Sequence, residues 1–423
     1  IEALTLDAKG VNAVALTGQS GLDLTAFTAK GTLTLSSDAN GFDGEVRAPR
    51  LAYRDYSLTG TTARGTFVID AAAVSMAALI EADRITGLPA RLQSPLGGNT
   101  RLDVTAALDR VSQMLSVDAV TLNGRKARAS GSGTYKLGGA VALNGDIAFE
   151  DNAPVEHFAG TWSFQGARLN TALIRLDGAM AFDQSMAALP QIISDDAQVT
   201  LAVQRDRSDL IIQTASLHSS QIDAKAAGTI KQRQLAISGD IVAPDLTLSA
   251  AKLNQLTAEF DLTGSTQSPK LALTASAAEL IAQGRNVDAP QLAGEIALTG
   301  DTAFSWRASA DYLDAPIALE IDGTRRTGMV DLTRIVADWA DLQANGAAAL
   351  NPSDPRASMI EIAIRGSPPT LGDIDAQISY RDQRLDGKVM LEGATFGPVS
   401  LARSEIDLSG TWPQFAGART YQA

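Results

Sequence analysis

Residues 256–262 read Leu-Thr-Ala-Glu-Phe-Asp-Leu. Apolar side chains occupy every second position, and Thr, Glu and Asp occupy the positions between them. Successive side chains of a β-strand point to opposite faces of the sheet, so this stretch predicts a strand with one apolar and one polar face. The same alternation recurs along most of the chain, in runs at 22–26, 33–35, 317–321, 360–364, 374–380, 389–391 and 406–408.

The residues between these runs indicate how the strands connect. Asx-Gly dipeptides between alternating runs predict tight hairpins. They occur at 43–44, 123–124, 144–145, 322–323 and 386–387. Strands spaced roughly 8–12 residues apart favour an antiparallel meander over a parallel βαβ array. With one crossing per ~11 residues, the chain would hold ~35–40 strands.

These patterns predict an all-β protein with one long antiparallel sheet and few short helices. The Ala-rich segment 71–82 has helical spacing, 104–115 is either helix or strand, and 185–193 is a further helix candidate broken by Pro190. Because strands twist, a sheet of this length must coil or split, and coiling buries one face. We expect two segments, 1–200 and 201–423, continuous with each other and interrupted only near 71–82 and 185–193.

Composition excludes several classes of protein. The 423 residues include no cysteine, so there is no disulfide framework, Cys-ligated zinc or thiol nucleophile. Hydrophobic residues make up 45%, too many for a disordered acidic chain. The formal net charge of -13 argues against a nucleic-acid binder, which needs clustered Lys and Arg against phosphate.

The termini suggest a piece of a longer protein. Residue 1 is Ile, and no signal peptide or transmembrane helix is visible in the sequence. We therefore expect any membrane anchor to lie outside this chain.

No pattern of residues predicts catalysis or metal binding. The only histidines are His157 and His218, and no Gly-x-Ser-x-Gly nucleophile elbow accompanies them. No calcium loop or His-rich zinc site is present either. We expect a protein that is not an enzyme and that carries no catalytic residue, metal or cofactor.

A loose repeat punctuates the chain. An apolar run, a Gly, a polar bridge, a Pro and a second apolar run succeed one another at 237–246 and again at 262–271. Shortened forms occur at 364–371 and 408–413. Gly has backbone freedom and Pro cannot donate to a ladder, so the phrase predicts turns between crossings. Such punctuation is typical of an array in which each unit leans on its neighbours.

With these phrases, and with related text at 88–104, 120–134 and 335–350, the sequence resembles the TamB/AsmA-like family of Gram-negative envelopes. The resemblance implies a β-taco-like fold, a sheet curled into an open trough with an apolar inner face. It implies a periplasmic protein, tethered to the inner membrane, that bridges phospholipid between the two membranes or assists outer-membrane protein assembly. The implied partners are phospholipid, an outer-membrane barrel protein of the TamA type, and the inner membrane through an anchor outside this chain.

The alternating residues agree with such a trough. Leu, Ile, Val and Ala dominate the apolar set, and aromatics are only 5% of the chain, whereas a filled sandwich core usually recruits more of them. From periodicity alone, these residues either fill a structural core or line a lipid groove. We expect the groove to include Leu246, Leu248, Leu256, Ala258, Phe260, Leu262, Ile317, Leu319, Ile321, Ile360, Ile362, Ile364, Ile374 and Ile378. The alternative from another class is a secreted β-solenoid, such as an adhesin or an autotransporter passenger.

Overall fold

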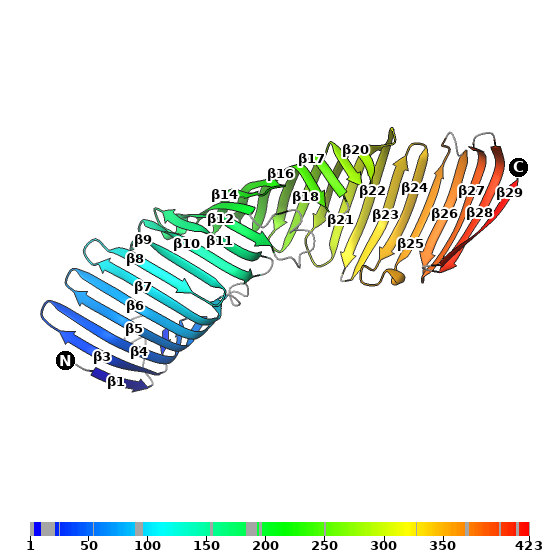
Figure 1. Cartoon of the computed structure of the whole chain (residues 1–423). Coiled ribbons are helices and arrows are strands. Elements are labelled where there is room, and N and C mark those ends of the chain that lie inside the picture. The colour runs from blue at the N-terminus through cyan, green and yellow to red at the C-terminus, as the bar shows by residue number, and fades with distance from the viewer. Residues whose placement is uncertain are drawn as a thin grey trace. The chain divides into compact units, whose positions relative to one another are not determined.

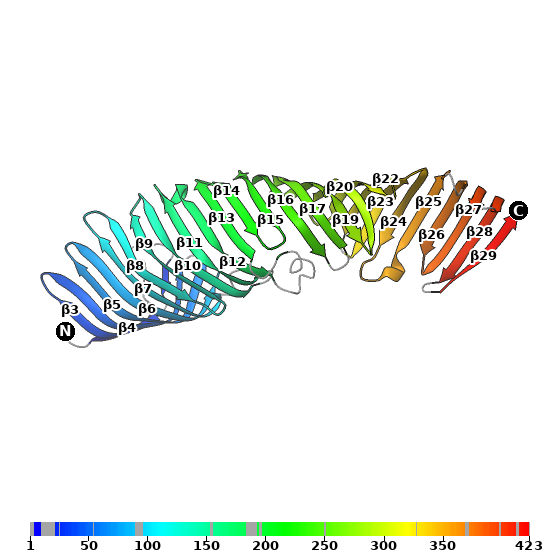
Figure 2. The same cartoon turned by 45° about the horizontal axis from the view of Figure 1, so that its top comes forward.

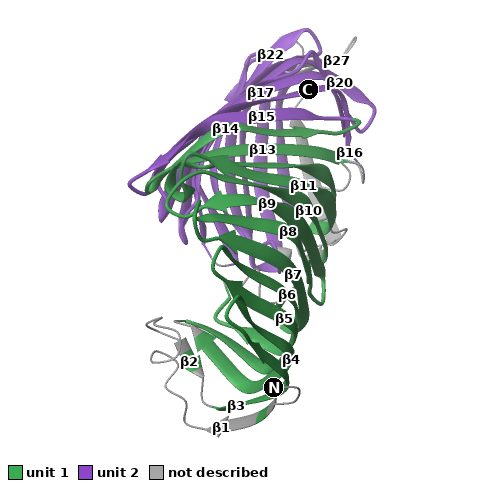
Figure 3. Cartoon of the chain, turned by 90° about the vertical axis from the view of Figure 1, so that its left-hand side faces the viewer, with its two compact units in different colours: residues 1–220 green, residues 221–423 purple. Residues whose placement is uncertain are grey.

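The computed structural model describes most of the chain. The described residues are 4–9, 22–24, 26–53, 55–88, 96–152, 155–182, 193, 197–248, 251–326, 328–368, 372–396, 399–411 and 414–422. They divide into two compact units, Ile1–Ser220 and Gln221–Ala423 (Figure 3). The boundary lies 20 residues beyond the one expected from the sequence.

Unit 1 is an antiparallel sheet whose strands pair almost entirely in chain order (Figure 1). Two short strands at its start depart from that order, since β1 pairs with β3 and β2 pairs with β4. Figure 2 shows the strands of this unit bending along their length, so its sheet is curled and not flat. The strands are β1 (Leu4–Lys9), β2 (Leu22–Leu24), β3 (Ala26–Leu35), β4 (Ala39–Tyr53), β5 (Tyr56–Asp70), β6 (Ala73–Thr86), β7 (Gly98–Asp109), β8 (Met114–Asn123), β9 (Ala127–Lys136), β10 (Val141–Asn152), β11 (Val155–Gly166), β12 (Leu173–Phe182), β13 (Ala197–Asp206) and β14 (Asp209–His218).

Unit 2 repeats this construction. Its strands β18 and β19 form one broken crossing, because both pair with β17 on one side and with β20 on the other. The strands are β15 (Asp223–Lys231), β16 (Gln234–Leu248), β17 (Ala251–Ser265), β18 (Ser268–Ser276), β19 (Glu279–Ala282), β20 (Arg285–Ala297), β21 (Thr302–Tyr312), β22 (Ala315–Arg326), β23 (Met329–Trp339), β24 (Leu342–Leu350), β25 (Met359–Gly366), β26 (Asp373–Arg381), β27 (Arg384–Phe396), β28 (Val399–Thr411) and β29 (Gln414–Gln422).

The predicted fold class is confirmed: the protein is all-β and its strand ladders are antiparallel. The described residues form 29 strands, fewer than the ~35–40 expected from an ~11-residue crossing. Many strands are longer than such a crossing allows: β4, β5, β16 and β17 each run for 15 residues, β6 for 14, and β20, β27 and β28 for 13. Outside the strands, the described part contains two short 3-10 turns, η1 (Leu169–Thr171) and η2 (Pro355–Ala357).

The helix predicted at 71–82 is wrong, since those residues belong mainly to β6. There Val74, Met76, Ala78 and Ile80 pair with apolar residues of β7, and this long-range ladder overrides the helical preference of Ala. Segment 104–115 forms parts of β7 and β8, as its strand alternative required. The candidate at 185–193 lies almost wholly outside the described residues.

Most of the predicted Asx-Gly turns are also wrong. Only Asn123-Gly124 follows the end of a strand, whereas the dipeptides at 43–44, 144–145, 322–323 and 386–387 lie inside β4, β10, β22 and β27. Hairpins instead turn at non-glycine pairs with positive φ, such as Leu313 (52°) and Asp314 (58°). The Gly239–Pro244 bridge likewise lies inside β16, while the Gly264–Pro269 bridge spans the turn from β17 to β18.

Candidate functional site: an apolar sheet face

One face of unit 2 is apolar from β15 to β28. The residues that pair with one another along its middle form a continuous row across the sheet, which we call the central row of unit 2. Its members are Ala226, Gly239, Phe260, Leu273, Gly294, Trp306, Ile321, Ile335, Gly346, Ile362, Ile378, Gly387 and Leu408. Every member is apolar or Gly, so the register between strands joins the alternating runs into one surface.

The register brings most of the predicted groove residues onto this face. Phe260, Ile321, Ile362 and Ile378 lie in the central row itself. The residues two positions away on the same strands flank it, namely Ala258, Leu262, Leu319, Ile360 and Ile364. Leu256, Ile317 and Ile374 continue the same alternation toward the strand ends.

Leu246 and Leu248 of β16, the first two predicted groove residues along the chain, reach the face in a different way. Within β16 the burial pattern changes phase at Pro244, so that Ala243 is buried and Leu246, three residues on, is only 5% exposed. Gln255 of β17, whose φ is 56°, lies across from Pro244 on the neighbouring strand. Beyond it Leu246 pairs with Leu253, Leu253 with Leu280, and Leu280 with Val287. The half-buried Leu248 lies in the next row toward the strand ends.

The apolar face is sheltered but not covered. Its Leu and Ile side chains in β17, β22, β25 and β26 are half-buried, while most of their polar neighbours are exposed. The buried residues on it are mainly small, such as Ala258 and Ala376. In the described part of the chain, Phe158 is the only large side chain that is completely buried. A filled sandwich core would instead bury many large side chains.

Unit 1 has a matching apolar face that the predicted site did not include. Its paired residues run from Phe42 and Phe67 through Met76 to Ala106. A parallel row contains Gly44, Gly65, Ala78, Val104, Val120 and Gly131, and Trp162, Leu176, Leu201 and Ala215 continue it across β11 to β14. The alternation at 74–80 was the sequence signal for this face, but the alanines around it suggested a helix.

Glycines on the apolar faces of the two units make room for large side chains of nearby strands. A Cβ at Gly131 would lie 2.8 Å from Trp162 Cζ2, and one at Gly178 would lie 2.8 Å from Phe158 Cζ. In unit 2, Gly294 is paired with Trp306 and Gly346 with Ile362. The large side chains therefore lie against the backbone of these glycines and protrude little from the sheet.

The opposite face of unit 2 is polar and carries several ion pairs. Arg334 contacts Glu320 at 2.8 Å and Asp322 at 3.6 Å, and Arg307 contacts Glu320 at 3.5 Å. These side chains are about one third to three quarters exposed, so each pair contributes little to stability. Their effect is to keep one face of each strand hydrated.

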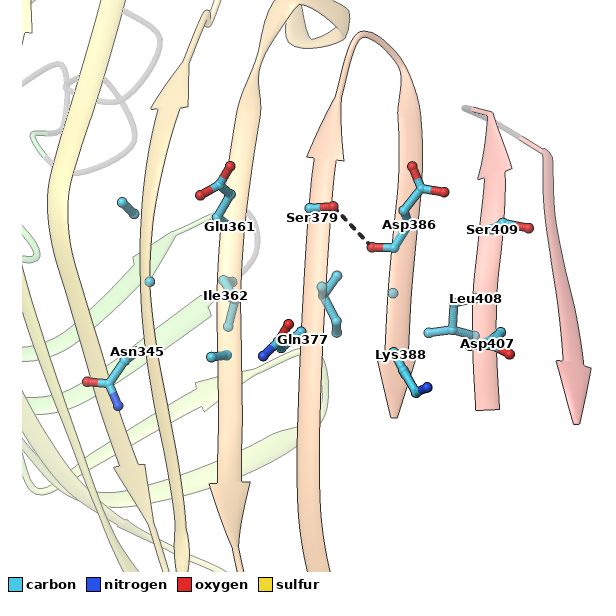
Figure 4. A pocket seen from close by; sticks show the side chains of 15 residues that line it. Asn345, Glu361, Ile362, Gln377, Ser379, Asp386, Lys388, Asp407, Leu408 and Ser409 are labelled. Atoms are coloured by element: carbon cyan, nitrogen blue, oxygen red, sulfur yellow. Dashed lines mark hydrogen bonds between the residues drawn. The ribbon is translucent and has the colours of Figure 1, made fainter. Parts of the chain in front are cut away.

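One hollow in unit 2, of about 730 Å³, lies on this polar face and is shown in Figure 4. Five central-row members line it together with the residues directly before and after them, including Glu361, Gln377 and Ser379. The apolar residues two positions away, such as Ile360 and Ile364, do not line it. Because residues one position from the row point to the polar side, the hollow opens there and not on the apolar face. Hollows of about 550 Å³ around Gly131 and about 590 Å³ around Leu292 are built in the same way.

Three of the four charged residues that line the first hollow form ion pairs. Glu361 contacts Arg381 at 3.3 Å, Asp386 contacts Arg384 at 2.8 Å, and Lys388 pairs with Glu405. The Lys388 ammonium lowers the pKa of the Glu405 carboxyl. The Ser379 hydroxyl donates to the backbone carbonyl of Asp386 at 3.3 Å. This arrangement is that of a hydrated sheet surface.

The two histidines lie on separate strands. His157 is exposed on β11, opposite Glu150, and His218 is exposed at the end of β14. Among the described residues, no group of three His, Cys, Asp or Glu side chains is placed to hold a metal ion. No helix in this part of the structure has the length and hydropathy needed to cross a membrane.

Comparison with known proteins adds no relative: no family model matches the chain, and no curated protein matches it.

Proposed function

We propose that this chain is a segment of a periplasmic bridge of the TamB/AsmA type, which shields phospholipid acyl chains during transport between the inner and outer membranes. The observation that carries the proposal is the apolar face of each unit. Its large aliphatic side chains are paired across successive strands and remain only half-buried. Leaving such a surface in water is unfavourable, so a ligand or partner of apolar character is expected on it.

An acyl chain suits this face energetically. A chain of ~16 carbons gains about 12 kcal/mol when its methylenes leave water, at ~0.8 kcal/mol each. Five of the eight strands from β21 to β28 place Ile or Leu in the central row, and the other three place Trp306, Gly346 and Gly387 there, with spacings of ~4.8 Å between crossings. Successive positions on such a surface bind a methylene chain almost equally well, so a lipid moves along it with small barriers. The headgroup stays in water, and the protein acts without catalysis.

The antiparallel ladders favour this reading over a secreted β-solenoid. Coils of a parallel β-helix stack parallel strands, whereas the described pairings of both units are antiparallel. The resemblance further suggests an anchor in the inner membrane and an outer-membrane barrel of the TamA type as partners.

Native mass spectrometry of the purified chain tests the proposal. The chain is produced in the periplasm of a Gram-negative host and purified without detergent. We expect protein ions that carry one or more phospholipid masses. Reproducible lipid-free spectra, under conditions that retain lipid on a known lipid carrier, would contradict the proposal.

A further inference from the structure

A cation and two aromatic rings meet at one edge of the apolar face in unit 2. The Tyr312 and Trp339 rings lie 5.9 Å apart between centroids, tilted by 46°. The indole N–H of Trp339 donates to the Tyr312 carbonyl oxygen at 3.4 Å. Arg285 Nη1 donates to the Tyr312 hydroxyl at 3.1 Å.

The register places all three residues at the same strand ends. Tyr312 ends β21, Trp339 ends β23, and Arg285 begins β20, whose Asp288 pairs with Asp311. Trp339 pairs with Ile317, so its ring continues the apolar row of that residue. Arg285 is the last member of a second row, in which it pairs with Ala282 and Ala282 pairs with Ala251. The guanidinium therefore stands where the apolar face meets water.

The chemistry of this edge matches a phospholipid at its interface. Tyr and Trp present an apolar ring and a polar tip, and they gather where hydrocarbon meets water. A guanidinium binds phosphate through several N–H donors at once. Arg285 is exposed, and its contact in the described structure is a neutral phenol, so its charge remains available to an anion.

We propose that Arg285, Tyr312 and Trp339 form a headgroup station for a glycerophospholipid. Arg285 binds the phosphate, and the two rings cover the glycerol and the first acyl carbons at the end of the apolar face. This inference rests on the proposed lipid function and specifies where and how the headgroup is recognised.

Two soluble lipids that differ only in the headgroup test the station. The intact chain, labelled with 5-fluorotryptophan, is titrated with dihexanoylphosphatidylcholine and with dihexanoylglycerol. The Trp339 resonance is assigned by Trp339→Phe and followed by fluorine NMR. We expect both lipids to shift it. Arg285→Gln should weaken the phosphocholine lipid about five-fold and leave the diacylglycerol unchanged.

A matched control lies at the same strand ends but on the polar face. Arg365 contacts Asp375 at 3.6 Å, and its β25 neighbour Ile364 lies on the apolar face. Arg365→Gln should leave both affinities unchanged, and circular dichroism checks that each variant folds. If Arg285→Gln leaves the phosphocholine affinity within two-fold, or weakens both lipids equally, the station is overturned while lipid binding stands. If neither lipid binds the wild-type chain, the proposed function fails as well.

Discussion

Phe304 of β21 pairs with Gly323 of β22, and its ring lies over the glycine: a Cβ at Gly323 would come within 2.7 Å of Phe304 Cζ. Gly323 is buried although its strand belongs to a single-layered sheet. The aromatic side chain thus packs sideways on the adjacent strand. The same arrangement joins Trp306 to Gly294. In both pairs, a large aromatic side chain of the apolar face packs against a glycine of the adjacent strand.

This pairing predicts an unusual cost for a small substitution. Gly323→Ala places a methyl group against Phe304 and also 2.5 Å from the Asp331 carbonyl oxygen, so the ring and backbone must shift. We expect a loss of about 1–3 kcal/mol, seen as a lower urea midpoint by circular dichroism. Gly300→Ala is the control, because a Cβ there meets nothing within 4 Å. Equal midpoints for the two variants would show that the ring does not depend on the glycine.

Truncation of two apolar side chains distinguishes a covered face from an open one. Phe158 is 1% exposed and stacks on Phe149 at 5.0 Å, so Phe158→Ala should cost about 3–5 kcal/mol. Ile362 is half-buried on the open face, so Ile362→Ala should cost only about 1–2 kcal/mol. Urea unfolding of both variants measures the difference. A cost at Ile362 as large as that at Phe158 would mean that another layer covers the face.

An acid-sensitive ion pair is expected on the polar face of unit 1. The Arg64 guanidinium, 2.6 Å from Glu45, lowers the pKa of that carboxyl, and Arg47 adds to the effect. Because the folded-state pKa lies below the unfolded value of about 4.3, the stabilisation is present above that pH and is lost as pH falls through the folded-state pKa. Glu45→Gln should therefore lower the unfolding midpoint slightly at pH 7 and have no effect in strong acid. A difference that grows on acidification would refute this assignment.

The period-two alternation was sufficient to predict the strands, because within a run such as 256–262 the apolar and polar residues already separate onto the two faces of the sheet. It failed at 71–82, where alanines satisfy a helix and a strand equally well and only the pairing with β7 decides. It also misplaced the Asx-Gly dipeptides. Gly323 is required opposite Phe304 of the neighbouring strand, and Gly387 pairs with Leu408 inside the sheet; both positions are set by the register and not by local sequence.

The candidate site was predicted only in part for the same reason. Alternation in single strands identified residues such as Ile362, but the central row exists only once the strands are aligned. Trp339 and Tyr312 lie 27 residues apart, and no local pattern indicated their contact. Local sequence also could not predict on which side of the sheet the hollows open, because that depends on how the sheet bends.

Aspartate substitutions at two adjacent residues of β25 test the proposed lipid-binding face most directly. Ile362→Asp puts a carboxylate on the apolar face, and Ala363→Asp puts one on the polar face of the same strand. Both variants are purified without detergent, checked for folding, and weighed for bound phospholipid by native mass spectrometry. We expect Ile362→Asp to lose most of its lipid and Ala363→Asp to keep the wild-type load. Equal lipid on the two folded variants would contradict the proposed lipid-binding face.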